Sequence, residues 1–89
     1  QAKVHILVIP KGSYVDVDDF SRNASKDEIA SLMHAVAEVC KITKVSLTEG
    51  GNGFRLIANT GPDGSQEVTH FHYHIMGGEP MGLRGLRKS

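Results

Sequence analysis

Three histidines at alternate positions, His70, His72 and His74, are the residues of this chain best suited to chemistry. Side chains of a strand alternate between its two faces, so a strand over residues 68–76 would present all three imidazoles on one face. Neighbouring rings would then stand roughly 7 Å apart along the strand. An imidazole has an ordinary pKa of about 6.5, so near pH 7 it is nucleophilic, and a modest shift makes it a proton donor. The spacing predicts a row of imidazoles arranged around one small ligand.

A structural role and a metal-binding role for this row both stay open. The histidines could be structural, although burying three imidazoles in a small core is unfavourable unless each finds a hydrogen-bond partner. They could also bind zinc, because His-x-His pairs on strands are common zinc ligands and Glu67 could join them. We favour a catalytic role. A nucleophilic imidazole must keep its lone pair free, so this interpretation requires neither a metal nor another cofactor.

Composition limits what else the chain can be. Its 89 residues, 39% of them hydrophobic, suffice for one small domain. Ten Lys plus Arg balance ten Asp plus Glu, which argues against nucleic acid as a partner. Cys40 is the single cysteine, so no intrachain disulfide or CxxC pair exists, as suits a reducing cytosol. Without an apolar run of about 20 residues or an export signal, we expect a cytoplasmic protein with no membrane partner.

Residue patterns predict the strands and the helix around the histidines. Ser25 and Glu28 form a capping box at the start of a helix whose apolar residues recur at helical spacing. Runs rich in β-branched and aromatic residues, bounded by Gly and Pro, predict strands. The expected elements are strands at residues 3–9, 54–60 and 68–76, a helix at 26–43 and a loop at 61–66. Together they predict an α+β fold, an antiparallel sheet with one long helix packed on it.

Residues outside the histidine row have simpler interpretations. The acidic run at residues 16–19 lacks the spacing of a calcium loop, so it is interpreted as a solvated turn leading to the helix. His34 is expected on the surface of the helix and Cys40 in the core. The basic residues between 84 and 88 could touch phosphate, but a disordered terminus is the better interpretation.

The histidine row also carries a family resemblance. The segment His70-Phe71-His72-Tyr73-His74-Ile75-Met76 resembles the motif of the histidine triad (HIT) superfamily, and the likeness extends through residues 4–11, 55–59 and 63–68. His74, where the nucleotidyltransferase branch has glutamine, resembles the hydrolase branches. Gly77-Gly78 resembles the Hint branch, the nucleoside phosphoramidases. The resemblance implies a HIT-like α+β domain that forms a homodimer.

Site residues and substrate follow from the same resemblance. It implies that His72 is the catalytic nucleophile, with His5 and His70 supporting it by hydrogen bonds. Phosphate would be contacted by Asn59, by His74, and by backbone N–H groups of Ser65, Gln66 and Glu67. The implied protein is a hydrolase that binds purine nucleotides such as adenosine monophosphate. It would cleave purine nucleoside 5'-phosphoramidates through a nucleotidyl-histidine intermediate. The alternatives are a dinucleoside polyphosphate hydrolase and a non-catalytic nucleotide- or metal-binding module.

The sequence departs from the HIT pattern at three places. Ser65 stands where glycine is more usual, and Glu67 stands where some relatives have serine. The chain opens at Gln1, where members of the superfamily have preceding elements that help to form the nucleotide pocket. The expectation is therefore a HIT domain over residues 1–89 that lacks its N-terminal part.

Overall fold

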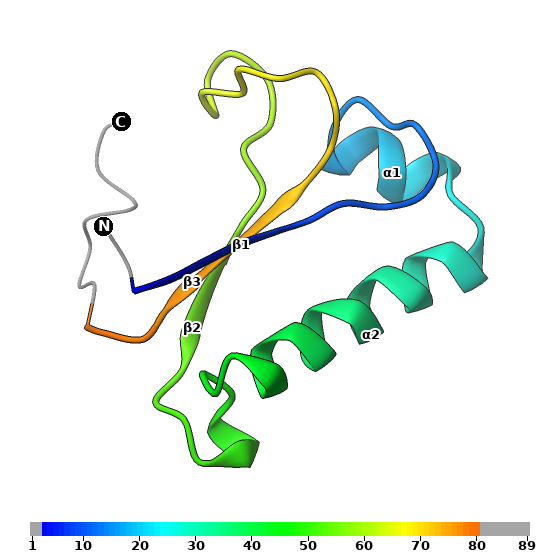
Figure 1. The fold of residues 1–89 in the computed structure, drawn as a ribbon. Helices are drawn as coiled ribbons and strands as arrows, with labels where there is room; N and C mark the ends of the chain where they lie inside the picture. The colour runs from blue at the N-terminus through cyan, green and yellow to red at the C-terminus, as the bar shows by residue number, and fades with distance from the viewer. Residues whose placement is uncertain (1–2, 81–89) are drawn as a thin grey trace.

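The sheet at the centre of the fold has three antiparallel strands. The computed structural model describes residues 3–80. The strands are β1 (Val4–Val8), β2 (Phe54–Ile57) and β3 (Tyr73–Gly77), in the order β1-β3-β2 (Figure 1). The central strand β3 pairs Tyr73 with Val8 on one side and His74 with Ile57 on the other. The strand that carries the end of the histidine row is therefore held from both sides.

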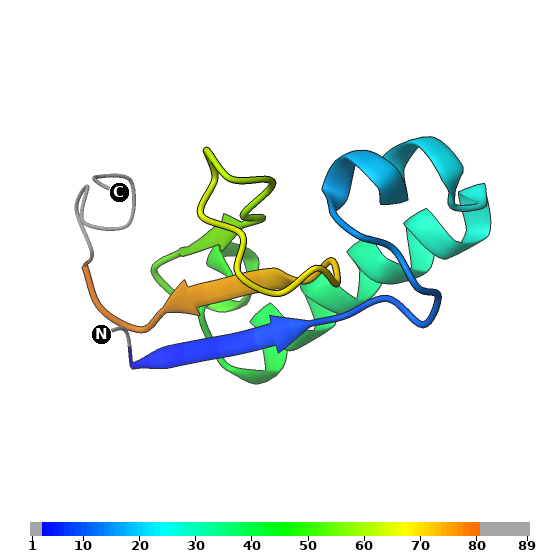
Figure 2. The same ribbon diagram turned by 90° about the horizontal axis from the view of Figure 1, so that it is seen from above.

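Helices cover one face of this sheet. The long helix α2 (Lys26–Ile42) lies across the sheet, and the shorter α1 (Val17–Asn23) lies near its end (Figures 1 and 2). A 3-10 turn, η1 (Leu47–Glu49), leads from α2 towards β2. The buried core between sheet and helices consists of Val8, Phe20, Leu32, Val36, Cys40, Val45, Phe71 and Ile75. The predicted α+β fold with an antiparallel sheet is thus confirmed, with a second helix that the prediction lacked.

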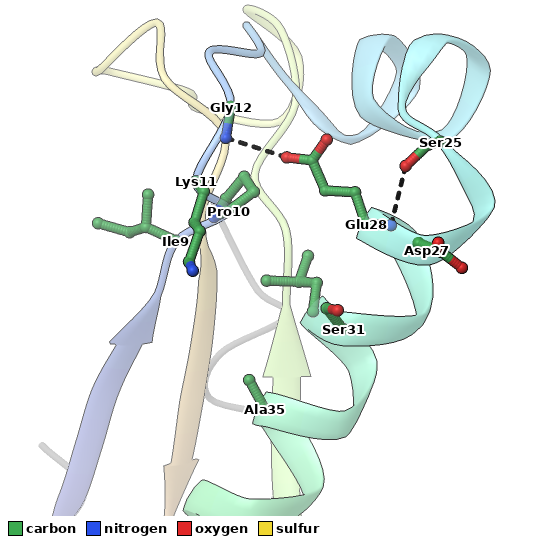
Figure 3. Close-up of a pocket in the computed structure, with 10 residues that line it drawn as sticks. Ile9, Pro10, Lys11, Gly12, Ser25, Asp27, Glu28, Ser31 and Ala35 are labelled. Atoms are coloured by element: carbon green, nitrogen blue, oxygen red, sulfur yellow. Dashed lines mark hydrogen bonds between the residues drawn. The ribbon is translucent and has the colours of Figure 1, made fainter.

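The start of α2 differs from the expected capping box in one bond. Ser25 is the N-cap, and its hydroxyl accepts a hydrogen bond from the Glu28 N–H at 3.0 Å, as predicted. The Glu28 carboxylate does not reach back to Ser25. It accepts hydrogen bonds from the Gly12 N–H at 2.9 Å (Figure 3) and from the Tyr14 hydroxyl at 2.7 Å. Glu28 therefore ties the connection after β1 to the helix.

The acidic segment 16–19 is the beginning of α1, not a solvated turn. Asp16 is the N-cap, and its carboxylate accepts a hydrogen bond from the Asp19 N–H at 2.8 Å. Asp18 and Asp19 lie in the first helical turn, where negative charge interacts favourably with the helix dipole. Phe20 is 3% exposed and packs against Tyr14 and Phe71 with ring centroids 5.1 and 5.0 Å away. One buried aromatic residue anchors this short helix.

The histidine strand is shorter than predicted, and this is a correction to the proposed row. β3 begins at Tyr73, so only His74 of the three histidines lies within a strand. The pairing with β1 ends at Val8, shortly before Pro10, which has no N–H to donate. The Phe71 N–H donates instead to the Tyr14 carbonyl at 2.7 Å. His70 and His72 therefore lie in an irregular segment that leads into the strand.

The remaining predictions concern residues away from the histidine row. β2 ends at Ile57 rather than at residue 60, while Leu56 and Ala58 pack against the core as expected. His34 is exposed and Cys40 is buried, and burial raises the pKa of the Cys40 thiol. No helix within residues 3–80 has the length and apolar character to cross a membrane. The basic segment at 84–88 lies outside the described residues.

Candidate active site

A cavity of about 460 Å³ opens beside the end of β3. It brings together segments that are well separated in the sequence, and its lining consists of Asn59, Ser65, Gln66, Glu67, Val68, His72 and His74. All six residues predicted to act in catalysis or substrate binding are among them. His5 and His70, predicted to support the nucleophile, lie outside this lining. The cavity has two walls: the histidine wall, His72 and His74, and the cavity loop, residues 61–68.

His72 is oriented by the main chain. Its Nδ1 lies 2.9 Å from the carbonyl oxygen of His70. A carbonyl oxygen only accepts hydrogen bonds, so in the neutral ring Nδ1 carries the proton and Nε2 keeps a free lone pair. The side chain of His70 is 3.3 Å from the Phe71 carbonyl through its own Nδ1, so it does not bond to His72. Support from residue 70 comes from its carbonyl group, not from its imidazole.

His74 links the cavity to the neighbouring strand. Its ring centroid is 4.8 Å from that of His72 in an edge-to-face arrangement. Its Nδ1 lies 2.9 Å from Nε2 of His5 on β1, so His5 contacts His74 rather than His72. Burial lowers the pKa of His74, and the charges of protonated His72 and His5 lower it further. His74 is therefore held in its neutral form at neutral pH.

The cavity loop is closed by hydrogen bonds of its own. The Ser65 N–H donates to the Pro62 carbonyl at 3.1 Å and the Gln66 N–H to the Gly61 carbonyl at 3.0 Å. This corrects the expectation that both amides face a phosphate. Within residues 3–80, the Glu67 N–H and the Ser65 hydroxyl have no hydrogen-bond partner. These two donors, rather than three consecutive amides, are available to a ligand.

The loop turns sharply at Gly64 and Ser65. A Cβ atom at position 64 would lie 2.4 Å from the Thr60 carbonyl oxygen, so only glycine fits there. Ser65 has a φ of 60°, in the left-handed region that favours glycine. This conformation explains why glycine is the more usual residue at position 65 in the HIT pattern. Serine accepts some backbone strain and adds a hydroxyl at the cavity.

Two functional positions escaped the sequence reasoning. The carbonyl of Tyr14 holds the segment before β3 through Phe71, and the carbonyl of Val15 accepts a hydrogen bond from Gln66 Nε2 at 2.6 Å. Both residues act through main-chain atoms, which any residue type provides. No pattern of side chains could have identified them.

The zinc alternative needs further ligands close to the histidines. Across the described residues, no three His, Cys, Asp or Glu side chains are grouped so that they could hold a metal ion. Glu67 lines the same cavity as His72 and His74 without completing such a group. The arrangement instead offers one imidazole with a free nitrogen, a second neutral imidazole, and residues with hydrogen-bond donors around the same cavity. That is a suitable arrangement for attack on an anionic phosphorus centre.

Comparisons with known proteins match this chain to HIT proteins. An uncharacterized HIT-like protein from Azospirillum brasilense is 48% identical over 82 residues, covering 92% of this chain and 64% of that protein. The purine nucleoside phosphoramidase of Escherichia coli K12 is 40% identical over 84 residues, covering 92% of this chain and 65% of the enzyme. A histidine triad protein from Clostridium difficile superposes with a TM-score of 0.75 at 36% identity, covering 91% of this chain and 66% of that structure.

These relatives are longer than this chain, which spans 64% of the Azospirillum protein and 65% of the Escherichia coli enzyme. The HIT domain model matches residues 1–81, nearly the whole sequence. The paired histidines, the glycine-dependent loop and the surrounding sheet all fall within that match. The chain belongs to the HIT domain family.

Proposed function

We propose that this protein hydrolyses purine nucleoside 5'-phosphoramidates with His72 as the nucleophile. The observation that carries the proposal is the pairing of His72 Nδ1 with the His70 carbonyl, because it leaves Nε2 as a free nucleophile beside a cavity. The relationship to the purine nucleoside phosphoramidase of Escherichia coli supports the choice of substrate.

The reaction takes two displacements at phosphorus. In the first, the Nε2 lone pair of His72 attacks phosphorus, the P–N bond to the amine breaks, and the departing amine takes up a proton from solvent. In the second, water attacks phosphorus, the bond to Nε2 breaks, and the nucleoside monophosphate leaves while the proton of water passes to solvent. Splitting one difficult displacement into two easier ones is the advantage of covalent catalysis.

The other cavity residues stabilise charge on the phosphoryl oxygens. A hydrogen bond donated by His5 Nε2 to His74 Nδ1 would leave His74 with a proton on its own Nε2, as a neutral donor. The Ser65 hydroxyl, the Glu67 N–H and the Asn59 carboxamide lie around the same cavity. Donors fixed in place before the reaction stabilise developing charge without having to reorient.

The site uses His72 as a nucleophile and His74 as a hydrogen-bond donor, and we propose that no metal takes part. We also propose that the protein works as a homodimer, as the HIT resemblance implies, because a small core gains from further burial.

A turnover assay with a trapping step tests the proposal. The full chain is mixed with adenosine 5'-phosphoramidate, and adenosine monophosphate is followed with time. A parallel reaction is quenched within the first turnover, and the peptide containing His72 is searched by mass spectrometry for an added adenylyl group. We expect monophosphate release, adenylylation at His72, and undiminished activity after dialysis against a strong chelator. No turnover, or activity lost to the chelator and restored by zinc, would overturn the proposal.

A further inference from the structure

We propose that helix α1 anchors the cavity loop through a chain of hydrogen bonds running from Asp19 through Val15 to Gln66. In this arrangement Gln66 is a positioning residue for the chemistry at His72, not a ligand of the phosphate. The inference rests on the proposed function for its catalytic consequence. Its structural part stands independently, on the hydrogen bonds that these three residues make.

Gln66 closes the loop with every hydrogen-bonding group it has. Its Oε1 accepts from the Gly61 N–H at 2.9 Å, and its Nε2 donates to the carbonyls of Val15 at 2.6 Å and Val68 at 3.0 Å. A carboxamide has two N–H donors, and both are used here. A phosphate oxygen only accepts hydrogen bonds, so Gln66 has no free donor to offer it. Contact with phosphate through this side chain would require breaking the loop.

The partner of Gln66 is itself fixed by α1. The Val15 N–H donates to the Asp19 carboxylate at 2.8 Å, so both polar groups of the Val15 backbone are bonded. The second oxygen of that carboxylate accepts from the Asn23 side chain at 2.8 Å, one turn further along the helix. The bond from Val15 and then the bond from Asn23 lower the pKa of Asp19, which keeps it ionised. Asp19, in the first turn of α1, therefore fixes the position of the Val15 backbone.

The position of the loop sets the geometry of the cavity. Ser65 and Glu67 flank Gln66 and line the cavity together with His72, so the bonds that fix Gln66 also hold the segment that carries the Ser65 hydroxyl and the Glu67 N–H. Misplacement of reacting groups by about 1 Å can cost roughly 10²-fold in rate. A hydrogen bond between residues 51 positions apart is thus expected to matter for catalysis, although Asp19 does not line the cavity.

Neighbouring aspartates of α1 provide a matched experiment. Asp19→Ala removes the anchor, whereas Asp18→Ala removes an equal charge from the same helical turn and loses only a bond to Arg22 between exposed side chains. Four variants are compared with the wild type: Asp19→Ala, Asp18→Ala, Gln66→Ala and the double variant Asp19→Ala/Gln66→Ala. One readout is amide hydrogen exchange at Ser65 and Gln66, whose N–H groups bond within the loop. The other is kcat for adenosine 5'-phosphoramidate.

We expect Asp19→Ala to speed exchange in the loop and to lower kcat about tenfold, with KM changing less. Asp18→Ala should match the wild type in both. Because Asp19 and Gln66 act through one chain of bonds, the paired variant should be no slower than Gln66→Ala alone. A paired loss equal to the product of the single losses, or unchanged exchange in Asp19→Ala, would overturn the anchor.

Two further arms keep the result decisive. Should Asp19→Ala melt α1, as seen by circular dichroism, Gln66→Glu takes its place, since it preserves size but puts an acceptor against the carbonyls of Val15 and Val68. Faster loop exchange in Gln66→Glu supports the anchor, and unchanged exchange refutes it. If the wild type does not hydrolyse phosphoramidates, the proposed function fails, while the exchange measurements still decide whether α1 holds the loop.

Discussion

The two walls of the cavity are held in place by different physical means. The histidine wall depends on the sheet and the core: His74 belongs to the central strand, and its neighbour Ile75 is fully buried beneath it. The cavity loop contains no regular element and buries no large side chain. It depends on the hydrogen bonds of Gln66 and on the absence of a side chain at Gly64. The histidine wall at His74 is therefore stabilised by apolar burial, and the cavity loop by directional polar contacts.

This difference separates stability from activity. Substitution of the buried residues beneath the histidine wall should lower the free energy of unfolding, because burial contributes most of the stability of a small domain. Damage to the cavity loop should change the rate more than the stability, because its bonds lie at the surface and are individually modest. Single substitutions in each wall test this division.

Removal of the nucleophile should have the largest effect on activity. His72→Ala is expected to lower single-turnover hydrolysis of adenosine 5'-phosphoramidate by on the order of 10³-fold or more, because it removes the covalent step. His72 is part-buried and lies outside the core, so the unfolding midpoint should change little. His34→Ala, an exposed histidine on α2, is the control and should retain full activity. Equal rates for wild type and His72→Ala would refute the assignment of the nucleophile.

A core change beneath the histidine wall should have the largest effect on stability. Ile75 has no exposed surface, and truncating a buried isoleucine to alanine costs about 2–5 kcal/mol. Ile42→Ala, at the end of α2 where the side chain is 67% exposed, should cost no more than about 0.5 kcal/mol. Urea unfolding of the two variants gives the comparison. Similar losses would mean that β3 is not held by burial as the structure indicates.

The parts of the site that could be predicted from the sequence also differ between the two walls. The position of His74 on a strand above the buried Ile75 was predictable because the alternation of residues is a local pattern. The loop residues were identified by resemblance to a family. The details failed where contacts over long sequence distances decide. The strand was predicted to begin at residue 68, but the bond from Phe71 to Tyr14 diverts the chain until Tyr73. The role of Gln66 depends on a carbonyl 51 residues away.

Helix α1 was missed for a related reason. Its segment is mostly polar, so hydrophobic periodicity gives almost no signal, and a single aromatic residue, Phe20, provides its burial. The useful signal was the Asp16 and Asp19 pair, spaced as an N-cap and its third helical residue are. Phe20 packs into a cluster with Tyr14 and Phe71, whose assembly depends on the tertiary fold.

Glycine substitutions at two strained positions should distinguish the effect of backbone strain on stability from the effect of the Ser65 hydroxyl on turnover. Ser65→Gly removes a side chain from a residue with φ of 60°, and Lys44→Gly does the same at φ of 64°, outside the cavity lining. Each should raise the free energy of unfolding by up to about 1 kcal/mol. Only Ser65→Gly also removes a donor from the cavity, so only it should slow turnover, by roughly tenfold. Slower turnover in Lys44→Gly as well would point to a global effect and remove this support for Ser65 as a phosphate contact.

The smallest expected effect is a pH dependence of stability that comes from His74. Burial, with the nearby charges of His72 and His5, lowers the pKa of His74 in the folded protein, so the unfolded chain binds the proton more readily. The stability contributed by neutral His74 is complete above the ordinary imidazole pKa of about 6.5 and is lost as the pH falls towards the folded pKa. Urea unfolding at about pH 8 and about pH 5 should therefore show a smaller loss for His74→Gln than for the wild type. His34→Gln should lose as much as the wild type, because His34 is exposed on α2. Equal losses of unfolding free energy for His74→Gln and the wild type would mean that the folded protein tolerates a protonated His74. His74 would then not need to be neutral beside a reacting phosphate.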